Sequence, residues 1–282
     1  MLESAVGVDL GGTKALFVSA AHSQRFDTVA SFTPTDFAAM LDAFVAGARV
    51  RVSRLGIAVP GLVDATGRVV ACDVLPALAG WLPRLALHGL GCQVTVLNDV
   101  EAALREELND APAGLTAGVV MAGTAIGAAF VVDGAPLRGT SGWAGELGYF
   151  PCSVGAEIKR LDEVAGGHAM AARRGVAPAT FAALALAADP DVLAVIDAGG
   201  SALGIGLAAV INLLNPSRLA LGGGAMDLPG YVEAADRVAR QHSIPALWRD
   251  CTIARVAAGE RVVALGALRA ALARPLREAM SP

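Results

Sequence analysis

The pattern that most constrains the fold of this chain is a unit of strand, glycine–threonine turn and strand that occurs twice. The copies occupy residues 6–18 and 117–132. In each, an apolar run enters a turn of small residues and leaves as a second apolar run, which is the pattern of a β-hairpin. The turns contain Gly11, Gly12 and Thr13 in the first copy, and Gly123 and Thr124 in the second. A pattern that recurs roughly a hundred residues later indicates an internal duplication.

The turn residues of both copies are suited to binding phosphate. Glycine lacks a Cβ, so its backbone can approach a ligand closely. Asp9 ends the first strand, beside the turn amides and the Thr13 hydroxyl, and a carboxylate next to N–H donors can hold a phosphate chain with its Mg²⁺. The second copy can present amides and a hydroxyl to the other side of such a chain. Both turns are equally compatible with plain hairpins, so the pattern alone leaves the two interpretations open.

Composition indicates an α/β protein and argues against several classes of function. Of the 282 residues, 55% are hydrophobic and only 5% are aromatic, which suits small-residue helices packed on strands. A net charge of -4 gives no electrostatic case for binding nucleic acid or an anionic membrane. The most apolar segment, 199–214, is interrupted by glycine and contains Asn212. We therefore expect it to be a buried helix and no membrane span.

The first residues and the cysteines favour a cytoplasmic location. The first strand begins by about residue 5, so we expect no signal peptide. The four cysteines are scattered along the chain without CxxC spacing. Free thiols in a reducing cytoplasm are therefore expected.

Between the two hairpins, a polar pair follows a buried strand. A strand is expected at 94–97 and a helix at 100–108, with Asn98 and Asp99 between them. Open α/β sheets bind ligands at such positions. Asn and Asp are also preferred helix caps, so position alone does not separate a ligand role for Asp99 from a capping role.

Turn and helix signals predict the other elements. Thr33 precedes a helical pattern that extends to about residue 50. A short buried strand near 55–59 ends at Pro60 and Gly61. Further helices are expected at 158–173, 192–214 and 262–278, and the polar link 109–114 is the candidate domain boundary.

Five motifs in order resemble the ROK family of sugar kinases, within the actin-like ATPase superfamily. They are DLGGTK at 9–14, AVPG at 58–61, LNDVEAAL at 97–104, the block from AGTAIG to GELG at 122–148, and LNPSRLALGGG at 214–224. The resemblance covers nearly the whole chain. It implies an α/β fold of two actin-like (ribonuclease H-like) domains, each a mixed sheet flanked by helices, with a cleft between the domains. Residues 1–110 would form the sugar and phosphate side and 111–282 the nucleotide side, with the last helix packing back toward the N-terminal domain.

The resemblance also implies a role for each candidate site residue. Asp99 would be the general base, accepting the proton of a sugar hydroxyl as that oxygen attacks the γ-phosphate of ATP. Asp9 would support Mg²⁺, through water. The residues expected to bind the nucleotide and its phosphates are Asp9, Gly11, Gly12, Thr13, Lys14, Gly123, Thr124, Gly222, Gly223 and Gly224. The residues expected to bind the sugar are Gly61, Asn98, Asp99, Glu146, Tyr149 and Asp162.

The chain departs from the family pattern on the sugar side. Tyr149 stands where relatives carry a histidine, and Asp162 where they carry a sugar-binding glutamate. The family's cysteine-rich zinc motif is shortened to residues 152–162, with Ser153, Gly155 and Arg160 in place of cysteines. Because a structural zinc site needs about four nitrogen or sulfur ligands, Cys152 cannot form one alone and we predict no zinc. Elsewhere, Glu101 replaces an asparagine and Ala125 a glycine.

The resemblance therefore implies an ATP- and Mg²⁺-dependent sugar kinase. Because losing an imidazole and gaining a phenol should alter the acceptor, we expect a hexose, an amino sugar or a cyclitol as the substrate. One alternative is a sugar-responsive regulator, but the first strand begins near Ser4, without the DNA-binding domain of such proteins. Another is a catalytically silent sugar-binding protein, against which the retained Asp9, Thr13 and Asp99 argue. The expected partner is a small sugar-like molecule, with no nucleic acid and no membrane. Relatives are often dimers, which leaves a homodimer open.

Overall fold

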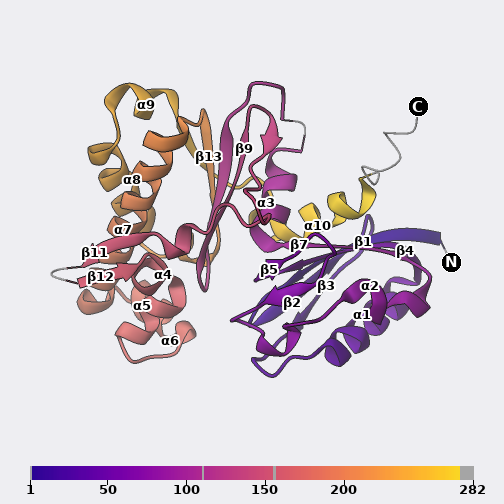
Figure 1. Cartoon of the computed structure of the whole chain (residues 1–282). Coiled ribbons are helices and arrows are strands. Elements are labelled where there is room, and N and C mark those ends of the chain that lie inside the picture. Colours follow the sequence, from indigo (N-terminus) through magenta and orange to yellow (C-terminus); the bar gives the residue numbers. More distant parts are fainter. Residues whose placement is uncertain (1, 110, 155–156, 274–282) are drawn as a thin grey trace. The chain divides into compact units, whose positions relative to one another are not determined.

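Each glycine–threonine hairpin lies at the centre of its own five-stranded sheet (Figure 1). The strand order is β3-β2-β1-β4-β7 in one sheet and β10-β9-β8-β13-β14 in the other. In both, the two hairpin strands pair antiparallel, and the first hairpin strand pairs parallel with a later strand on its other side. The two sheets thus have the same topology, as an internal duplication predicts. The predicted α/β class, with mixed sheets flanked by helices, is confirmed.

The computed structural model describes residues 2–109, 111–154 and 157–273. The chain divides into two compact units. Unit 1 contains 1–109, 139–143 and 261–282, and unit 2 contains 110–138 and 144–260.

In unit 1 the strands are β1 (Leu2–Leu10), β2 (Lys14–Val18), β3 (Ser23–Asp27), β4 (Val50–Val59), β5 (Leu62–Val63), β6 (Val69–Ala71) and β7 (Gln93–Asn98). The helices are α1 (Pro34–Ala48), α2 (Pro83–Ala86), α3 (Asp99–Glu107) and α10 (Val262–Leu272).

In unit 2 the strands are β8 (Ala117–Ala122), β9 (Ile126–Val132), β10 (Ala135–Pro136), β11 (Pro151–Val154), β12 (Glu157–Arg160), β13 (Arg218–Gly222) and β14 (Thr252–Arg255). The helices are α4 (Asp162–Ala165), α5 (Gly167–Arg173), α6 (Pro178–Leu186), α7 (Pro190–Leu214), α8 (Tyr231–His242) and α9 (Pro245–Asp250).

The sheet of unit 1 is covered on both faces because its central strands alternate large and small residues. Val6 and Val8 of β1 lie in a core with three aromatic or aliphatic side chains of α1, namely Phe37, Leu41 and Phe44. Thr33 caps this helix as expected, with its hydroxyl accepting the Asp36 N–H and the Asp36 carboxylate accepting the Thr33 N–H. This reciprocal cap fixes the start of α1.

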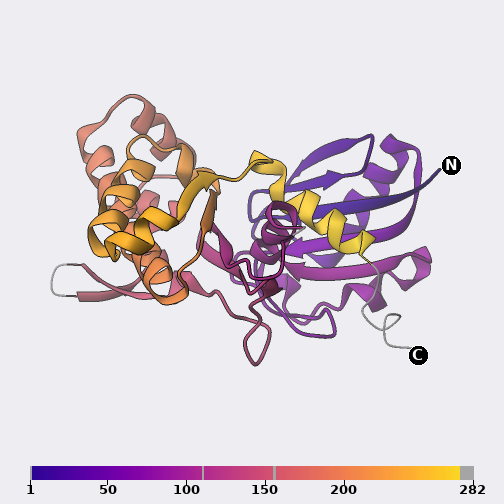
Figure 2. The same cartoon turned by 90° about the horizontal axis from the view of Figure 1, so that it is seen from above.

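The other face of the sheet touches the backbone of α10 at two glycines (Figure 2). An ideal Cβ at Gly7 would lie 2.2 Å from the Ala264 carbonyl oxygen, and one at Gly56 would lie 1.9 Å from that of Ala267. Any larger residue would lift the helix off the strands. This helix was expected at 262–278; α10 ends at Leu272, and the positions from 274 lie outside the described residues.

The core helix of unit 2 is α7, which packs along α8. Ideal Cβ atoms at Gly200 and Gly204 would lie 2.3 Å and 2.5 Å from carbonyl oxygens of α8, so these glycines allow the close approach. Among the described residues, α7 is the one helix long and apolar enough to cross a membrane. However, 61% of its most apolar window is buried, in agreement with the expected buried helix.

The segment expected as one helix at 158–173 forms a strand and two short helices instead. Glu157–Arg160 forms β12, which pairs antiparallel with β11, so Ile158 belongs to a hairpin and the helical residues begin at Asp162. Gly166 is extended (φ -67°, ψ 142°) and separates α4 from α5. The helix prediction was wrong here because cross-strand pairing overrode the local pattern.

Candidate active site

The turn of the first hairpin is held in shape from outside the hairpin. Its closing bond runs from the Gly11 N–H to the Lys14 carbonyl, at 2.8 Å. Thr28 follows β3, and its hydroxyl donates to the Gly11 carbonyl at 2.5 Å, while its N–H donates to the Thr13 carbonyl at 3.1 Å. Thr28 is buried, and Thr13 is exposed. The carbonyls of Gly11, Thr13 and Lys14 are therefore satisfied within the protein.

Gly12 packs against Val74, so that a side chain at position 12 would collide with it. An ideal Cβ there would lie 2.3 Å from a methyl carbon of Val74. Packing against Val74 alone is enough to require glycine, so the residue does not by itself indicate close approach of a ligand.

Three strand ends bring the unit 1 candidates to one edge of the sheet. Asp9 near the end of β1 is in register with Ala58 of β4, and Val59 of β4 is in register with Asn98 at the end of β7. Because these three strands are parallel, Asp9, Gly61 and the pair Asn98–Asp99 all lie toward the same edge. This is where an open α/β sheet binds ligands.

The charges of Asp9 and Asp99 act on each other at this edge. Burial raises the pKa of Asp9 from 3.8 to about 7, with a further contribution from the negative charge of Asp99 and an opposing one from Lys14. Carboxylates that repel each other in a partly desolvated site are suited to share a cation. Mg²⁺ fits this donor set, since it is commonly bound by one or two carboxylates together with water and substrate phosphates.

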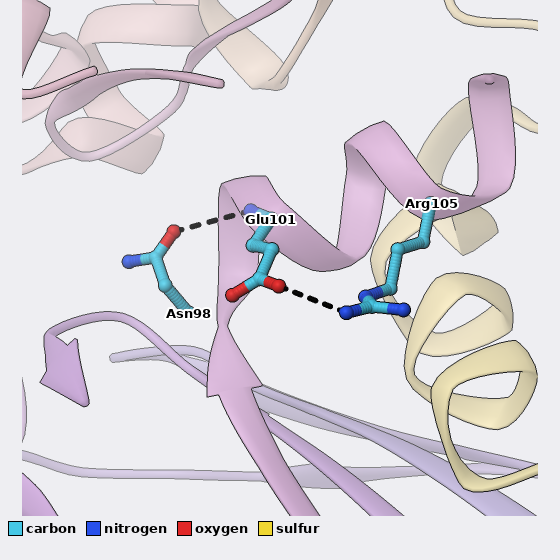
Figure 3. Close-up of polar contacts among 3 residues, drawn as sticks. All are labelled: Asn98, Glu101 and Arg105. Carbon is cyan, nitrogen blue, oxygen red and sulfur yellow. Dashed lines mark hydrogen bonds and ion pairs between the residues drawn. The ribbon is translucent and has the colours of Figure 1, made fainter. Parts of the chain in front are cut away.

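Asn98 is the cap of α3 (Figure 3). Its amide oxygen accepts the N–H groups of Val100 at 2.8 Å and Glu101 at 3.3 Å, and its amide nitrogen donates to the Gly61 carbonyl at 3.1 Å. Asp99 is the first helical residue, and one of its oxygens also accepts the Val100 N–H. The capping role thus belongs chiefly to Asn98. The ligand role of Asp99 stays a prediction.

The neighbouring side chains are also engaged. Glu101 forms an ion pair with Arg105 one turn along α3, at 3.0 Å (Figure 3). Gly61 packs so closely on the next loop that an ideal Cβ would lie 2.2 Å from the Ala71 carbonyl oxygen. The buried Cys72 thiol donates to the Pro60 carbonyl at 3.4 Å. These contacts fix the loop after β4 beside Asn98.

In unit 2, strand pairing brings the two glycine motifs together. Gly222 at the end of β13 is in register with Met121 of β8. Gly223 has φ +92°, and an ideal Cβ on it would lie 2.3 Å from the Ala122 carbonyl oxygen, so its backbone rests directly on the end of β8. By contrast, ideal Cβ atoms at Gly123 and Gly224 would meet no atom within 4 Å. Open backbone at these positions is suited to a nucleotide.

Two further carboxylates of unit 2 have raised pKa values. Glu146 precedes the short turn Leu147–Tyr149, and Asp162 begins α4. The pKa of Glu146 is raised by desolvation and by the charge of Asp162. Desolvation also raises the pKa of Asp162, while the Ile126 N–H lowers it. The structure thus places within one unit the two acids that the sequence assigned to the sugar.

Tyr149 and the shortened loop form a different local structure from a zinc site. The guanidinium of Arg160 lies 4.6 Å from the centre of the exposed Tyr149 ring. Cys152 is buried in β11, and Ser153 pairs with Ile158 in the β11–β12 hairpin. Gly155 lies outside the described residues. Among those described, no group of three or more His, Cys, Asp or Glu side chains could hold a metal ion.

Several residues of the site were not identified from the sequence. Thr28 was missed because its bonds depend on the pairing of β3 with β2. Gly166 and Gly167 were missed as well, although Gly167 donates its N–H to the Gly123 carbonyl at 2.8 Å. The two adjacent glycines at the start of α5 were the sequence signal that could have identified this contact. The indole N–H of Trp143 donates to the Val63 carbonyl at 3.0 Å within unit 1.

Comparison with known proteins agrees with this description. The model of the ROK family matches residues 5–274. A kanosamine kinase of Amycolatopsis mediterranei is 27% identical over 253 residues, which are 80% of this chain and 82% of that protein. An N-acetyl-D-glucosamine kinase of Erwinia tasmaniensis is 27% identical over 277 residues, 85% and 90% of the two chains. The crystal structure of a ROK hexokinase from Thermus thermophilus superposes with a TM-score of 0.76 at 25% identity, covering 95% of this chain and 98% of the other. The chain therefore belongs to the ROK family.

Proposed function

We propose that this protein is an ATP-dependent kinase that phosphorylates a hydroxyl group of a sugar or sugar-like molecule. Family membership supports the proposal, as do the relatives named as sugar kinases. The observation that carries it is the gathering of Asp9, Gly61, Asn98 and Asp99 at one edge of the unit 1 sheet. Phosphoryl transfer needs positioning and charge neutralisation, and this edge offers both.

In the proposed reaction, Asp99 is the general base. Its carboxylate accepts the proton of the acceptor hydroxyl as the hydroxyl oxygen attacks the γ-phosphate of ATP, and ADP leaves. The position of Asp99 is fixed by α3, whose first turn is capped by Asn98. Because Asn98 already accepts the amides of Val100 and Glu101, the helix does not depend on Asp99 for its cap.

Asp9 is the proposed metal-side residue, holding Mg²⁺ through water. When bound, Mg²⁺ supplies positive charge that offsets the phosphate oxygens. The raised pKa of Asp9, about 7, supports this assignment, because a nearby cation would favour the ionised form. Gly11, Gly12, Thr13 and Lys14 are assigned to the phosphates.

We assign nucleotide contacts in unit 2 to Gly123, Thr124 and residues 222–224. Thr124 and Gly224 are exposed, and no atom lies near the Cβ positions of Gly123 and Gly224, which supports the assignment. In this proposal unit 1, which includes α10, is the sugar and phosphate side, and unit 2 is the nucleotide side.

The acceptor is proposed to be a hexose, an amino sugar or a cyclitol, contacted by Glu146 and Tyr149. Tyr149 supports a non-standard acceptor, because its phenol stands in place of a histidine and stacks under Arg160. The named relatives act on kanosamine and N-acetyl-D-glucosamine. Four free cysteines, three of them buried, support a reducing cytoplasm as the location. A homodimer and the absence of nucleic-acid and membrane partners remain proposals.

A coupled assay of ADP release tests the function. The purified protein with Mg²⁺ and ATP is screened against hexoses, N-acetylhexosamines, amino sugars and cyclitols, with a reaction lacking acceptor as the control. At least one acceptor should raise ADP release well above the control. If none does and calorimetry detects no Mg²⁺–ATP binding, the kinase proposal fails and a catalytically silent binding protein is favoured.

A further inference from the structure

One oxygen of the Asp162 carboxylate is hydrogen-bonded inside the protein. This oxygen, Oδ1, accepts the N–H of Ile126 at 2.6 Å. Ile126 begins β9, immediately after the turn that contains Gly123 and Thr124. A charged acceptor on a backbone amide makes one of the stronger hydrogen bonds found in proteins. Asp162 is therefore bonded to the end of the phosphate turn of unit 2, here defined as residues 123–126.

The same carboxylate packs against Gly148. An ideal Cβ on Gly148 would lie 2.3 Å from Oδ1 of Asp162 and 2.5 Å from Oδ2, and 2.4 Å from the Ile126 carbonyl oxygen. Only glycine leaves room for the carboxylate at this point. Gly148 belongs to the acceptor loop, here defined as residues 145–149, which also carries Glu146 and Tyr149.

The acceptor loop runs beside the start of β9. The Ala128 N–H donates to the Gly145 carbonyl at 3.0 Å. Gly145 has φ +108°, and an ideal Cβ on it would lie 2.0 Å from the Ala128 carbonyl oxygen. Contacts at Gly145 and Gly148 thus hold both ends of the loop on β9, and Asp162 lies at the second of them.

The residues after Asp162 hold the other side of the phosphate turn. The Gly167 N–H donates to the Gly123 carbonyl at 2.8 Å, and the His168 N–H donates to the Thr124 carbonyl at 3.3 Å. An ideal Cβ on Gly166 would lie 2.9 Å from the Thr124 carbonyl oxygen. The segment 162–168 therefore bonds the turn at two carbonyls and, through Asp162, at one amide.

We propose that Asp162 is a positioning residue that ties the acceptor loop to the phosphate turn, and that it is not a ligand of the sugar. This inference rests on the proposed function. Aspartate is one methylene shorter than the glutamate of the family pattern. Its Oδ1 accepts the Ile126 N–H, and both of its oxygens lie where a side chain on Gly148 would stand. Recognition of the acceptor by side chains of unit 2 then falls to Glu146 and Tyr149.

A positioning role and a sugar-binding role for Asp162 have different kinetic consequences. Losing a sugar ligand raises the KM for the acceptor and leaves the KM for ATP unchanged. Losing the tie disturbs the acceptor loop and the phosphate turn together, so both KM values rise. The asparagine variant separates the cases further, because an amide oxygen can still accept the Ile126 N–H but lacks the charge.

The test compares Asp162→Asn and Asp162→Ala with Glu163→Gln as the matched control. Glu163 is the adjacent carboxylate, and it accepts the N–H of Arg160 at 2.9 Å, away from Ile126. Each variant is assayed for both KM values and for amide hydrogen exchange of Ile126 in the ligand-free protein. We expect Asp162→Asn and the control to stay within about threefold of wild type in every readout. In Asp162→Ala, exchange at Ile126 should accelerate about tenfold or more, and both KM values should rise by a similar factor.

Two results would overturn the proposal. One is an acceptor KM at least tenfold higher in Asp162→Asn with ATP KM and Ile126 exchange unchanged, which would make Asp162 a sugar ligand. The other is unaltered Ile126 exchange in Asp162→Ala. Because exchange is measured without substrates, it decides the tie even if the ADP-release screen finds no acceptor and the proposed function fails.

Discussion

Replacing Asp9 by asparagine is expected to stabilise the folded protein at alkaline pH while abolishing its activity. The pKa of Asp9 is raised from 3.8 to about 7 by burial and by Asp99. Between these values the folded state binds more protons than the unfolded state, so the stability of the wild type falls as pH rises through this window. Asparagine resembles the protonated acid and carries no such dependence.

The size of the effect follows from the pKa difference. About 1.4 kcal/mol per pKa unit gives at most about 4 kcal/mol above pH 7, and solvent screening of a partly exposed carboxylate reduces this to about 2 kcal/mol. For a chain of this size, about 2 kcal/mol corresponds to a rise in Tm of roughly 4–8 °C at pH 8. The gain should shrink toward zero as the pH approaches 4.

Thermal unfolding of wild type and Asp9→Asn at pH 4.5, 6 and 8, without Mg²⁺, measures this directly. Asp64→Asn is the control, because its effect on stability should depend on pH in the opposite direction. The pKa of Asp64 is lowered by hydrogen bonds from the Thr66 side chain and the Arg68 backbone, so its stabilisation is present at high pH and is lost as pH falls. An Asp9→Asn variant whose Tm difference from wild type is the same at pH 4.5 and 8 would refute the reasoning.

Three further substitutions test the support of the site. Thr28→Val should cost about 1 kcal/mol of stability and raise the KM for ATP, because it removes the hydroxyl bonded to the Gly11 carbonyl, whereas Thr28→Ser should retain both in thermal unfolding and kinetics. Gly12→Ala should cost about 1–3 kcal/mol in denaturant unfolding, and a Val74→Ala background should recover part of that loss. Asn98→Ala should cost about 1 kcal/mol through the lost helix cap, and Asn98→Asp, which keeps an accepting oxygen, should unfold closer to wild type.

Local patterns were sufficient to predict the two glycine–threonine hairpins and the cap of α1. Each depends on residues a few positions apart, such as Thr33 and Asp36. The strand Glu157–Arg160 was not predicted, because its conformation depends on pairing with β11.

The environment of the candidate site residues could not be read from the sequence. The charge of Asp99 raises the pKa of Asp9. The two residues are ninety positions apart, and the strand order β1-β4-β7 brings them to the same edge of the sheet. The hydrogen bonds from Thr28 to the Gly11 and Thr13 carbonyls depend on the register of β3. This strand alternates between exposed and partly buried residues. Asp162 was identified as an acid of the acceptor side, but its bond to Ile126 is a tertiary contact with no local signal.

The most direct test of the proposed mechanism is the turnover of Asp99→Asn with the acceptor found in the ADP-release screen. Asparagine can keep the oxygen that accepts the Val100 N–H at 2.9 Å, so the fold should survive, with Tm no lower than wild type. The exposed Asp42 of α1 provides the matched control, Asp42→Asn. Loss of a general base should lower kcat by about 10²–10⁴-fold in Asp99→Asn, with Mg²⁺–ATP affinity retained and the control unchanged. A kcat within a few fold of wild type would contradict the assignment of Asp99 as the base.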